Sequence, residues 1–215
     1  MSSLPHLPSM PVVAAVVGTA IASFAVALWL GPAWNIWVTT GAAASATLAI
    51  GWMSAGQALR AQLVTTPRGV AQGLAGGILL TGVTHLSYAL TAPLVPGLSQ
   101  EVRRLYDLLE APPGPLAAIP ILTAVVLAEE LVWRGILLPA LRTRLRAWPA
   151  IALATVLYAL PQLASSSWVL VAAALGCGAV WTLQRERSGS LVVPTVTHLT
   201  WDILVFVAFP LGAST

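Results

Sequence analysis

The sequence predicts an all-α protein, a polytopic transmembrane helix bundle of about seven spans, with six to eight compatible with its pattern. Hydrophobic residues make up 58% of the chain and charged residues only 8%, whereas soluble domains average about 25% charged residues. The mean hydropathy is +0.87, and the apolar residues gather in runs long enough to cross a bilayer. We therefore expect residues 1–215 to form a single integral membrane domain.

Each apolar run is taken as one span, and short polar segments separate the runs. The expected spans are Pro11–Leu30, Ile36–Met53, Val70–Leu90, Leu116–Leu141, Pro149–Leu163, Trp168–Leu183 and Leu191–Leu211. The fifth and sixth runs are short. They are expected either to cross with little tilt or to form one tight re-entrant pair.

Arginine placement predicts the orientation, because cytoplasmic loops of membrane proteins carry an excess of positive charge. The chain has ten arginines and no lysine. With a cytoplasmic N-terminus, the inner loops hold Arg60, Arg68, Arg142, Arg144, Arg146, Arg185 and Arg187, and the outer loops hold Arg103 and Arg104. We therefore expect a multi-pass protein of the cell membrane with its N-terminus in the cytoplasm. The net charge of +3 is small and the arginines are scattered along the chain, so no nucleic-acid partner is predicted.

Tryptophans are enriched at membrane interfaces and agree with this orientation. The outer interface is expected to hold Trp29, Trp34, Trp37 and Trp168, and the inner interface Trp52, Trp148 and Trp181. The remaining two, Trp133 and Trp201, are expected to lie deep, each beside a charged motif.

Two further patterns concern packing and the membrane surface. The small residues of Gly73-x-x-x-Gly77 and Ala174-x-x-x-Gly178 predict close helix approach. The segment Glu101–Glu110 has apolar residues at helical spacing and predicts a short interfacial helix on the outer surface. A gate over a lateral opening is the alternative role for this segment.

Three charges interrupt the fourth apolar run, in LAEELVWRGILL. Glu130 and Arg134 are four residues apart on one helix face, which predicts a buried ion pair. Glu129 points about 100° away and is left without its own counter-ion. A carboxyl group in such a poorly solvated place can act as a general base or acid near neutral pH. The alternative is that all three charges form one packing network between helices.

Two other spans carry polar pairs at the same spacing. His198 and Asp202, in THLTWD, share a face of the last span, and an aspartate there can orient the histidine or contact a bound carbonyl. Tyr158 and Gln162, in LYALPQL, share a face of the fifth span. Taken alone, this second pair is more typical of helix packing than of chemistry.

In order, these pieces resemble the three motifs of the CAAX-protease and bacteriocin-processing (CPBP, or Abi) family of intramembrane endopeptidases. EELVWR, YALPQ and HLTWD are similar to the family patterns Glu-Glu-x-x-x-Arg, Phe-x-x-x-His and His-x-x-x-Asn/Asp. The resemblance covers roughly residues 116–209, the expected catalytic core. The earlier spans match only in being hydrophobic.

The resemblance implies roles for these residues. Glu129 would activate the water that attacks the scissile peptide, while Glu130 and Arg134 would support the site. His198 and Asp202 would bind the carbonyl oxygen as charge develops on it.

The second motif departs from the family, because Gln162 stands where the family has histidine. Glutamine cannot exchange a proton near pH 7, although it can position a water by hydrogen bonds. His85, in the third span, lies at a depth comparable to that of Gln162 and is a candidate substitute. The alternative for His85 is a hydrogen bond between helices.

No cofactor is expected. The chain has no His-Glu-x-x-His motif, and its one cysteine, Cys177, lies in an apolar run and is taken as a packing residue. A zinc ion held by Glu129, His198 and Asp202 is disfavoured, because Gln162 removes the fourth plausible ligand.

We therefore predict an intramembrane endopeptidase that hydrolyses a membrane-associated peptide or protein segment with a glutamate-activated water. Two alternatives stay open. One is a catalytically impaired pseudopeptidase that binds membrane peptides as an immunity or scaffold protein, and Gln162 is its main support. The other is a small proton-coupled transporter that uses Glu129, Glu130 and His198 as a relay.

Overall fold

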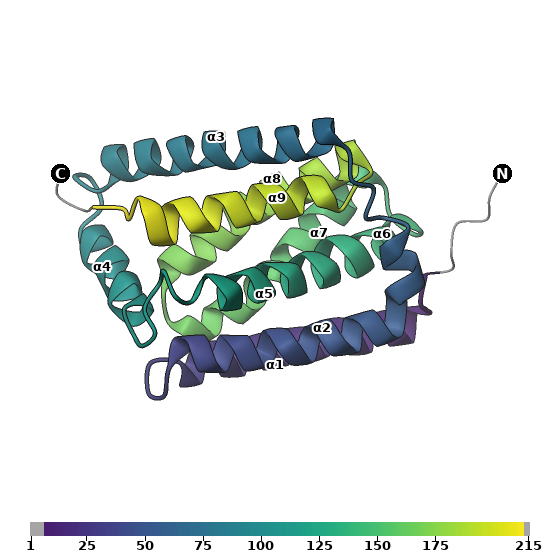
Figure 1. Ribbon diagram of the computed structural model, residues 1–215, viewed down its shortest axis with the longest axis horizontal. Helices are drawn as coiled ribbons and strands as arrows, with labels where there is room; N and C mark the ends of the chain where they lie inside the picture. Colours follow the sequence, from purple (N-terminus) through teal and green to yellow (C-terminus); the bar gives the residue numbers. More distant parts are fainter. Residues whose placement is uncertain (1–6, 213–215) are drawn as a thin grey trace.

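The apolar runs of the first half become long helices that begin at polar caps or prolines. A computed structural model describes residues 7–212 of the chain (Figure 1). Its first helices are α1 (Met10–Leu30), α2 (Ile36–Arg60), α3 (Pro67–Thr91) and the short α4 (Leu98–Leu109). Asn35 caps α2 by accepting from the backbone N–H groups of Trp37 and Val38, and Thr66 caps α3. These caps satisfy donors that a helix start leaves unpaired.

The second half contains three spans that change helix type along their length. The first of these joins α5 (Ile119–Glu129), the π-helix η1 (Glu130–Leu137) and α6 (Leu138–Arg142) into one continuous rod. The second joins α7 (Ala147–Ala159) to the 3₁₀ turn η2 (Leu160–Ser165), and is followed by α8 (Trp168–Ser188). The last joins α9 (Val192–Asp202) to the π-helix η3 (Ile203–Ala208).

The predicted helix bundle is confirmed, and no strand occurs within residues 7–212. In this same range, five helices are long and apolar enough to cross a membrane, and Val192–Ala208 is a shorter apolar helix. Both the fifth and the sixth predicted runs belong to these five, as Ala147–Ser165 and Trp168–Ser188. This length favours two full spans over the re-entrant pair.

The helices lie roughly along one axis, with α4 across one end of the bundle (Figure 1). α3 lies beside α9 on one side, and α1 lies beside α2 on the other. The rod that begins with α5 runs between these two sides and packs on α2. The connection between α1 and α2 and the end of η3 lie at the same end of the bundle as α4.

Glycines let α3 and α9 approach closely. A Cβ atom at Gly73 would collide with Val196, and one at Gly77 would collide with Thr200. The close approach predicted from Gly73-x-x-x-Gly77 is therefore confirmed.

Two of the tryptophans predicted to lie at the interfaces are buried inside the protein. Trp37, at the start of α2, donates from Nε1 to the carbonyl of Leu109 at the end of α4 (3.0 Å). Trp181 is also buried, at 1% exposure, in the centre of the bundle. The interface prediction concerns position along the helix and does not say on which face the side chain lies. The two tryptophans predicted to lie deep, Trp133 and Trp201, are buried.

Candidate active site

A buried ion pair forms the base of the polar cluster, as the i,i+4 spacing predicts. Nη1 of Arg134 lies 3.1 Å from Oε1 of Glu130, and both side chains are almost fully buried. Arg134 also donates from Nη2 to the carbonyl of Gly178 (3.0 Å) and from Nε to the hydroxyl of Thr182 (3.3 Å). These contacts use the several donors of the guanidinium group and tie η1 to α8.

Gly178 makes this contact sterically feasible. A Cβ atom at position 178 would come within 2.7 Å of the Tyr158 ring and 3.4 Å of Nη2 of Arg134. The guanidinium group in turn lies over the Tyr158 ring, with Cζ 4.4 Å from its centroid. The small residue at the end of Ala174-x-x-x-Gly178 thus makes room for the site itself.

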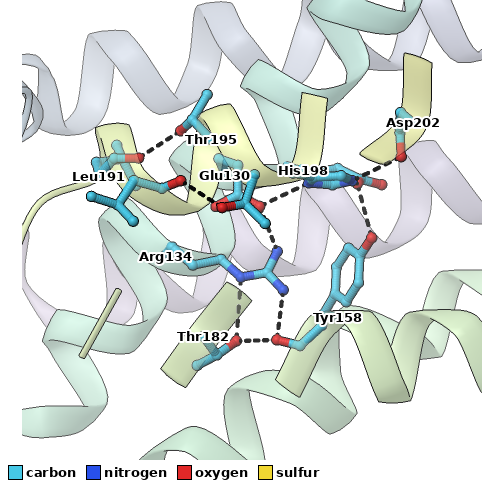
Figure 2. Close-up of polar contacts among 12 residues, drawn as sticks. Glu130, Arg134, Tyr158, Thr182, Leu191, Thr195, His198 and Asp202 are labelled. Atoms are coloured by element: carbon cyan, nitrogen blue, oxygen red, sulfur yellow. Dashed lines mark hydrogen bonds and ion pairs between the residues drawn. The ribbon is translucent and has the colours of Figure 1, made fainter. Parts of the chain in front are cut away.

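His198 has one glutamate near each of its ring nitrogens. Figure 2 shows it between Glu130 and Asp202. Its Nδ1 is 2.9 Å from Oε1 of Glu130. An ionised carboxylate can only accept, so the proton of this bond belongs to Nδ1. The other nitrogen, Nε2, lies 3.6 Å from Oδ1 of Asp202 and 3.8 Å from Oε2 of Glu129. The sequence predicted a contact of Glu130 with Arg134 alone. The bond from His198 to Glu130 is an additional contact.

Glu129 lies apart from the ion pair and receives a hydrogen bond from another span. The hydroxyl of Tyr158 donates to Oε2 of Glu129 over 3.1 Å. Among the described residues, this is the one hydrogen bond recorded for the Glu129 side chain. Its carboxylate therefore keeps acceptor sites free for a ligand or a water.

One cavity of about 190 Å³ meets these side chains. Its polar lining residues include Thr40, Glu129, Tyr158, Gln162, Ser165, His198 and Asp202. Since a water occupies roughly 30 Å³ in the liquid, the space suffices for several waters or a short stretch of peptide. Each of the three motifs therefore contributes residues to a common space, whereas Glu130 and Arg134 are absent from its lining.

The cavity continues towards the α4 end of the bundle through an apolar lining. This part is lined by Phe24 and Leu28 of α1, Trp37 of α2, Leu105, Leu108 and Leu109 of α4, and Leu122 and Val125 of α5. The helix predicted from Glu101–Glu110 is thus present as α4, and its apolar face borders the cavity. This arrangement gives weight to the gate alternative.

The two alternative partners for the attacking water lie in different places. Gln162 lines the cavity beside Glu129 and His198. His85, on α3, is absent from the cavity lining, and its Nε2 has no hydrogen-bond partner among the described residues. The hypothesis that His85 replaces the family histidine finds no support in this arrangement.

The carbonyl of Gly135, next to the ion pair, accepts a side-chain hydrogen bond from the end of another helix. In the π register of η1 its backbone donor would be the N–H of Ala140, whereas in α register it would face Pro139, which has no N–H. Nε2 of Gln62 donates to this carbonyl (3.0 Å), and Arg185 donates to Oε1 of Gln62 (2.6 Å). Gln62 thus bridges the end of α2, the residue after Arg134, and α8.

The second π-helix, η3, also has a carbonyl that accepts from a side chain of another helix. In π register the carbonyl of Val205 would accept from residue 210, which is Pro210. The hydroxyl of Tyr106, on α4, donates to this carbonyl over 2.8 Å and accepts from the backbone N–H of Leu211 over 2.9 Å. A side chain of α4 therefore holds the end of the helix that carries His198.

Four residues in or around the site were not predicted there: Trp181, Thr182, Gln62 and Tyr106. Pro139 and Pro210 are a signal in the sequence for the last two, because each proline lacks a backbone donor near the carbonyl that the side chain contacts. Nothing in the sequence pairs those prolines with Gln62 or Tyr106, since the contacts join distant segments.

The side chains that could hold a metal ion are those of His, Cys, Asp and Glu. Within residues 7–212, no group of three or more His, Cys, Asp or Glu side chains has an arrangement that could hold a metal ion. Cys177 is buried in α8 and unpaired within the described chain, as expected for a packing residue.

Comparison with known proteins identifies a family for the segment that carries the motifs. Residues 112–204 match the model of a family described as type II CAAX prenyl endopeptidase Rce1-like. The match covers all three motifs and confirms the resemblance derived from them. Searches among curated proteins and among solved structures found no match to the chain.

Proposed function

Because residues 112–204 belong to the Rce1-like family, we propose that this multi-pass membrane protein is an intramembrane endopeptidase whose general base is Glu129. The family match indicates a CAAX-type protease, and the arrangement of the site supports the finer assignment. The single observation that carries it is that Glu129, Gln162, His198 and Asp202, from three spans, line the same cavity.

In the proposed reaction, Glu129 removes a proton from a water in the cavity, and the water attacks the scissile carbonyl carbon. The acceptor sites of the Glu129 carboxylate that Tyr158 leaves free suit this role as a base. Tyr158 holds the carboxylate in one orientation, and Gln162 positions the water by hydrogen bonds. The proton then passes to the nitrogen of the leaving amine.

His198 and Asp202 would contact the carbonyl oxygen as negative charge develops on it. Nε2 of His198 lies towards Glu129 and Asp202, and because the Nδ1 proton is bonded to Glu130, Nε2 donates only when the imidazole is protonated. Asp202 contributes a donor only when protonated, because an ionised carboxylate is an acceptor. Glu130 and Arg134 support the site by fixing His198 and the adjoining backbone.

The proposed substrate is a peptide or membrane-protein segment that reaches the cavity past α4. The apolar lining between α1, α2, α4 and α5 supports an uncharged segment. The catalytically impaired peptide binder is the alternative with an observation in its favour, since Gln162 occupies the cavity wall where a proton-exchanging group would act.

The test compares wild-type protein in proteoliposomes with the variants Glu129→Gln and Glu110→Gln. Glu110 is exposed at the end of α4 and offers the same chemical change outside the site. A tagged peptide library is expected to be cleaved by the wild type and by Glu110→Gln, and not by Glu129→Gln. Binding of peptides without cleavage would indicate the pseudopeptidase. A proton flux lost in Glu129→Gln without any proteolysis would indicate the transporter.

A further inference from the structure

The imidazole of His198 lies face to face with the indole of Trp181. The two ring centroids are 3.5 Å apart and the ring planes differ by 18°. Both side chains are buried, with 1% of Trp181 and 3% of His198 exposed. Trp181 comes from α8, a span that contributes no residue to the three motifs.

Ring packing and a cation–π contact hold the indole in this place, with Cζ of Arg134 5.5 Å from the ring centroid. Its neighbours are the Tyr158 ring (centroids 6.2 Å apart, 71° between planes) and the Trp201 ring (5.8 Å, 68°), both in edge contact. Its Nε1 has no hydrogen-bond partner within the described residues. The indole is thus wedged between two other rings in the geometry that aromatic pairs prefer.

Hydrogen bonding alone does not fix the imidazole plane. Nδ1 makes a short bond to Glu130, whereas Nε2 lies 3.6 Å from Asp202 and 3.8 Å from Glu129, beyond ordinary hydrogen-bond length. One bond leaves the ring free to tilt about the Nδ1 contact. A flat partner against one face removes that freedom.

We propose that Trp181 is a positioning residue, which holds the His198 ring so that Nε2 faces the space between Glu129 and Asp202. This role rests on the proposed peptidase function. The indole face also favours a cation. Because the Nδ1 proton is bonded to Glu130, Nε2 can donate to a carbonyl oxygen only when the ring is protonated, and the stack suits this cationic form. Trp181 also lines the cavity, and the proposed role is the one that it exerts through its stack on His198.

The first experiment reads the stack without requiring activity. Protein labelled at histidine is studied by NMR in micelles, and the His198→Asn variant identifies the His198 signals among those of the three histidines. The ring protons of His198 are expected upfield, because they lie over an indole face. The Nδ1 proton is expected far downfield, because it is bonded to Glu130.

The variants Trp181→Leu and Trp181→Phe distinguish the loss of buried apolar volume from the loss of a flat ring against His198. Leucine should abolish the upfield displacement and broaden or lose the Nδ1 proton signal, whereas phenylalanine should retain both in part. Trp168→Leu is the matched control, because Trp168 lies on the same helix and is half exposed. This control should leave the His198 signals unchanged.

The second experiment measures cleavage by the same variants. Trp181→Leu is expected to lower kcat by about 10²-fold with KM nearly unchanged, since small displacements of a catalytic group cost about this much. Trp181→Phe should recover most of the rate, and Trp168→Leu should match the wild type.

Separate results would overturn the two proposals. A folded Trp181→Leu protein with wild-type kcat, or one whose Nδ1 proton signal keeps its wild-type position and width, contradicts the positioning role while leaving the peptidase assignment intact. A wild-type protein that cleaves nothing contradicts the peptidase assignment, and the NMR spectra of the variants still decide whether Trp181 orients His198.

Discussion

Glu130 and His198 are joined by a bond of 2.9 Å between Oε1 and Nδ1, although 68 positions separate them in the chain. The same oxygen of Glu130 also accepts from Arg134 at 3.1 Å. The second glutamate of the EELVWR motif therefore links the fourth predicted span to the last. Its burial makes this link sensitive to the loss of either partner.

Replacing Arg134 should lower the stability of the folded protein more than replacing a surface arginine. The variant Arg134→Leu leaves Glu130 as a buried charge without its counter-ion, which costs about 3–5 kcal/mol. Arg142→Leu serves as the control, because its ion pair with Glu186 is partly exposed and exposed pairs are worth about 0–1 kcal/mol. Thermal unfolding in detergent measures both. Equal melting temperatures for the two variants would contradict the structural role given to Arg134.

Replacing Gln162 by histidine should raise the rate of peptide cleavage. Histidine can exchange a proton near neutral pH at a position that already lines the cavity, whereas glutamine cannot. The expected gain in kcat is up to about 10²-fold, the lower range for general acid–base catalysis. The pH–rate profile should also acquire a limb near the ordinary pKa of histidine. An unchanged rate and profile in a folded variant would mean that Gln162 does not stand in for a proton-transfer group.

Gln62→Leu should lower both stability and activity. It leaves the carbonyl of Gly135 and the guanidinium group of Arg185 without their partner, at a cost of roughly 1–3 kcal/mol for each buried polar group that stays unpaired. Because Gly135 follows Arg134 directly, kcat should fall as well. Gln57→Leu is the control, since Gln57 is exposed in the last turns of α2, shortly before Gln62. If both variants melt and react alike, Gln62 does not hold the π-helix.

The Tyr106 hydroxyl should make the stability of the folded protein decrease at alkaline pH. Burial raises the pKa of the Tyr106 hydroxyl above 10.0; the bond from the backbone of Leu211 offsets part of this rise, and nearby Tyr88 adds to it. The folded state therefore holds this proton more tightly than the unfolded state. The stabilisation is fully present below the unfolded pKa and is lost as the pH rises through the folded pKa.

The comparison is between wild type and Tyr106→Phe from pH 8 to 11. Wild type should melt at the higher temperature at pH 8, because the donor to Val205 is intact. The difference should shrink above pH 10, where the hydroxyl ionises. A difference that grows with pH would contradict the linkage.

Local spacing predicted the parts of this site that lie within one helix. The pairing of Glu130 with Arg134 and the proximity of His198 to Asp202 follow from i,i+4 geometry, which holds wherever the span lies in the bundle. The helical runs themselves followed from hydropathy, since a bilayer span must satisfy its backbone internally.

Contacts between helices could not be predicted from this spacing. The rotation of α8 that places Trp181 against His198, and the bond from Gln62 to Gly135, depend on how the helices pack. Hydropathy gives the length of a span and not the face that each residue occupies. Trp181 was for this reason placed at the interface, although it lies in the centre of the bundle.

The most direct measurement is the incorporation of ¹⁸O from labelled water into the new carboxyl terminus of a cleaved peptide, followed by mass spectrometry for wild type and Glu129→Gln. The proposed reaction requires one labelled oxygen in the wild-type product and a rate reduced by about 10²–10⁴-fold in the variant. Cleavage by a folded Glu129→Gln protein at the wild-type rate, or a wild-type product without the label, would contradict it.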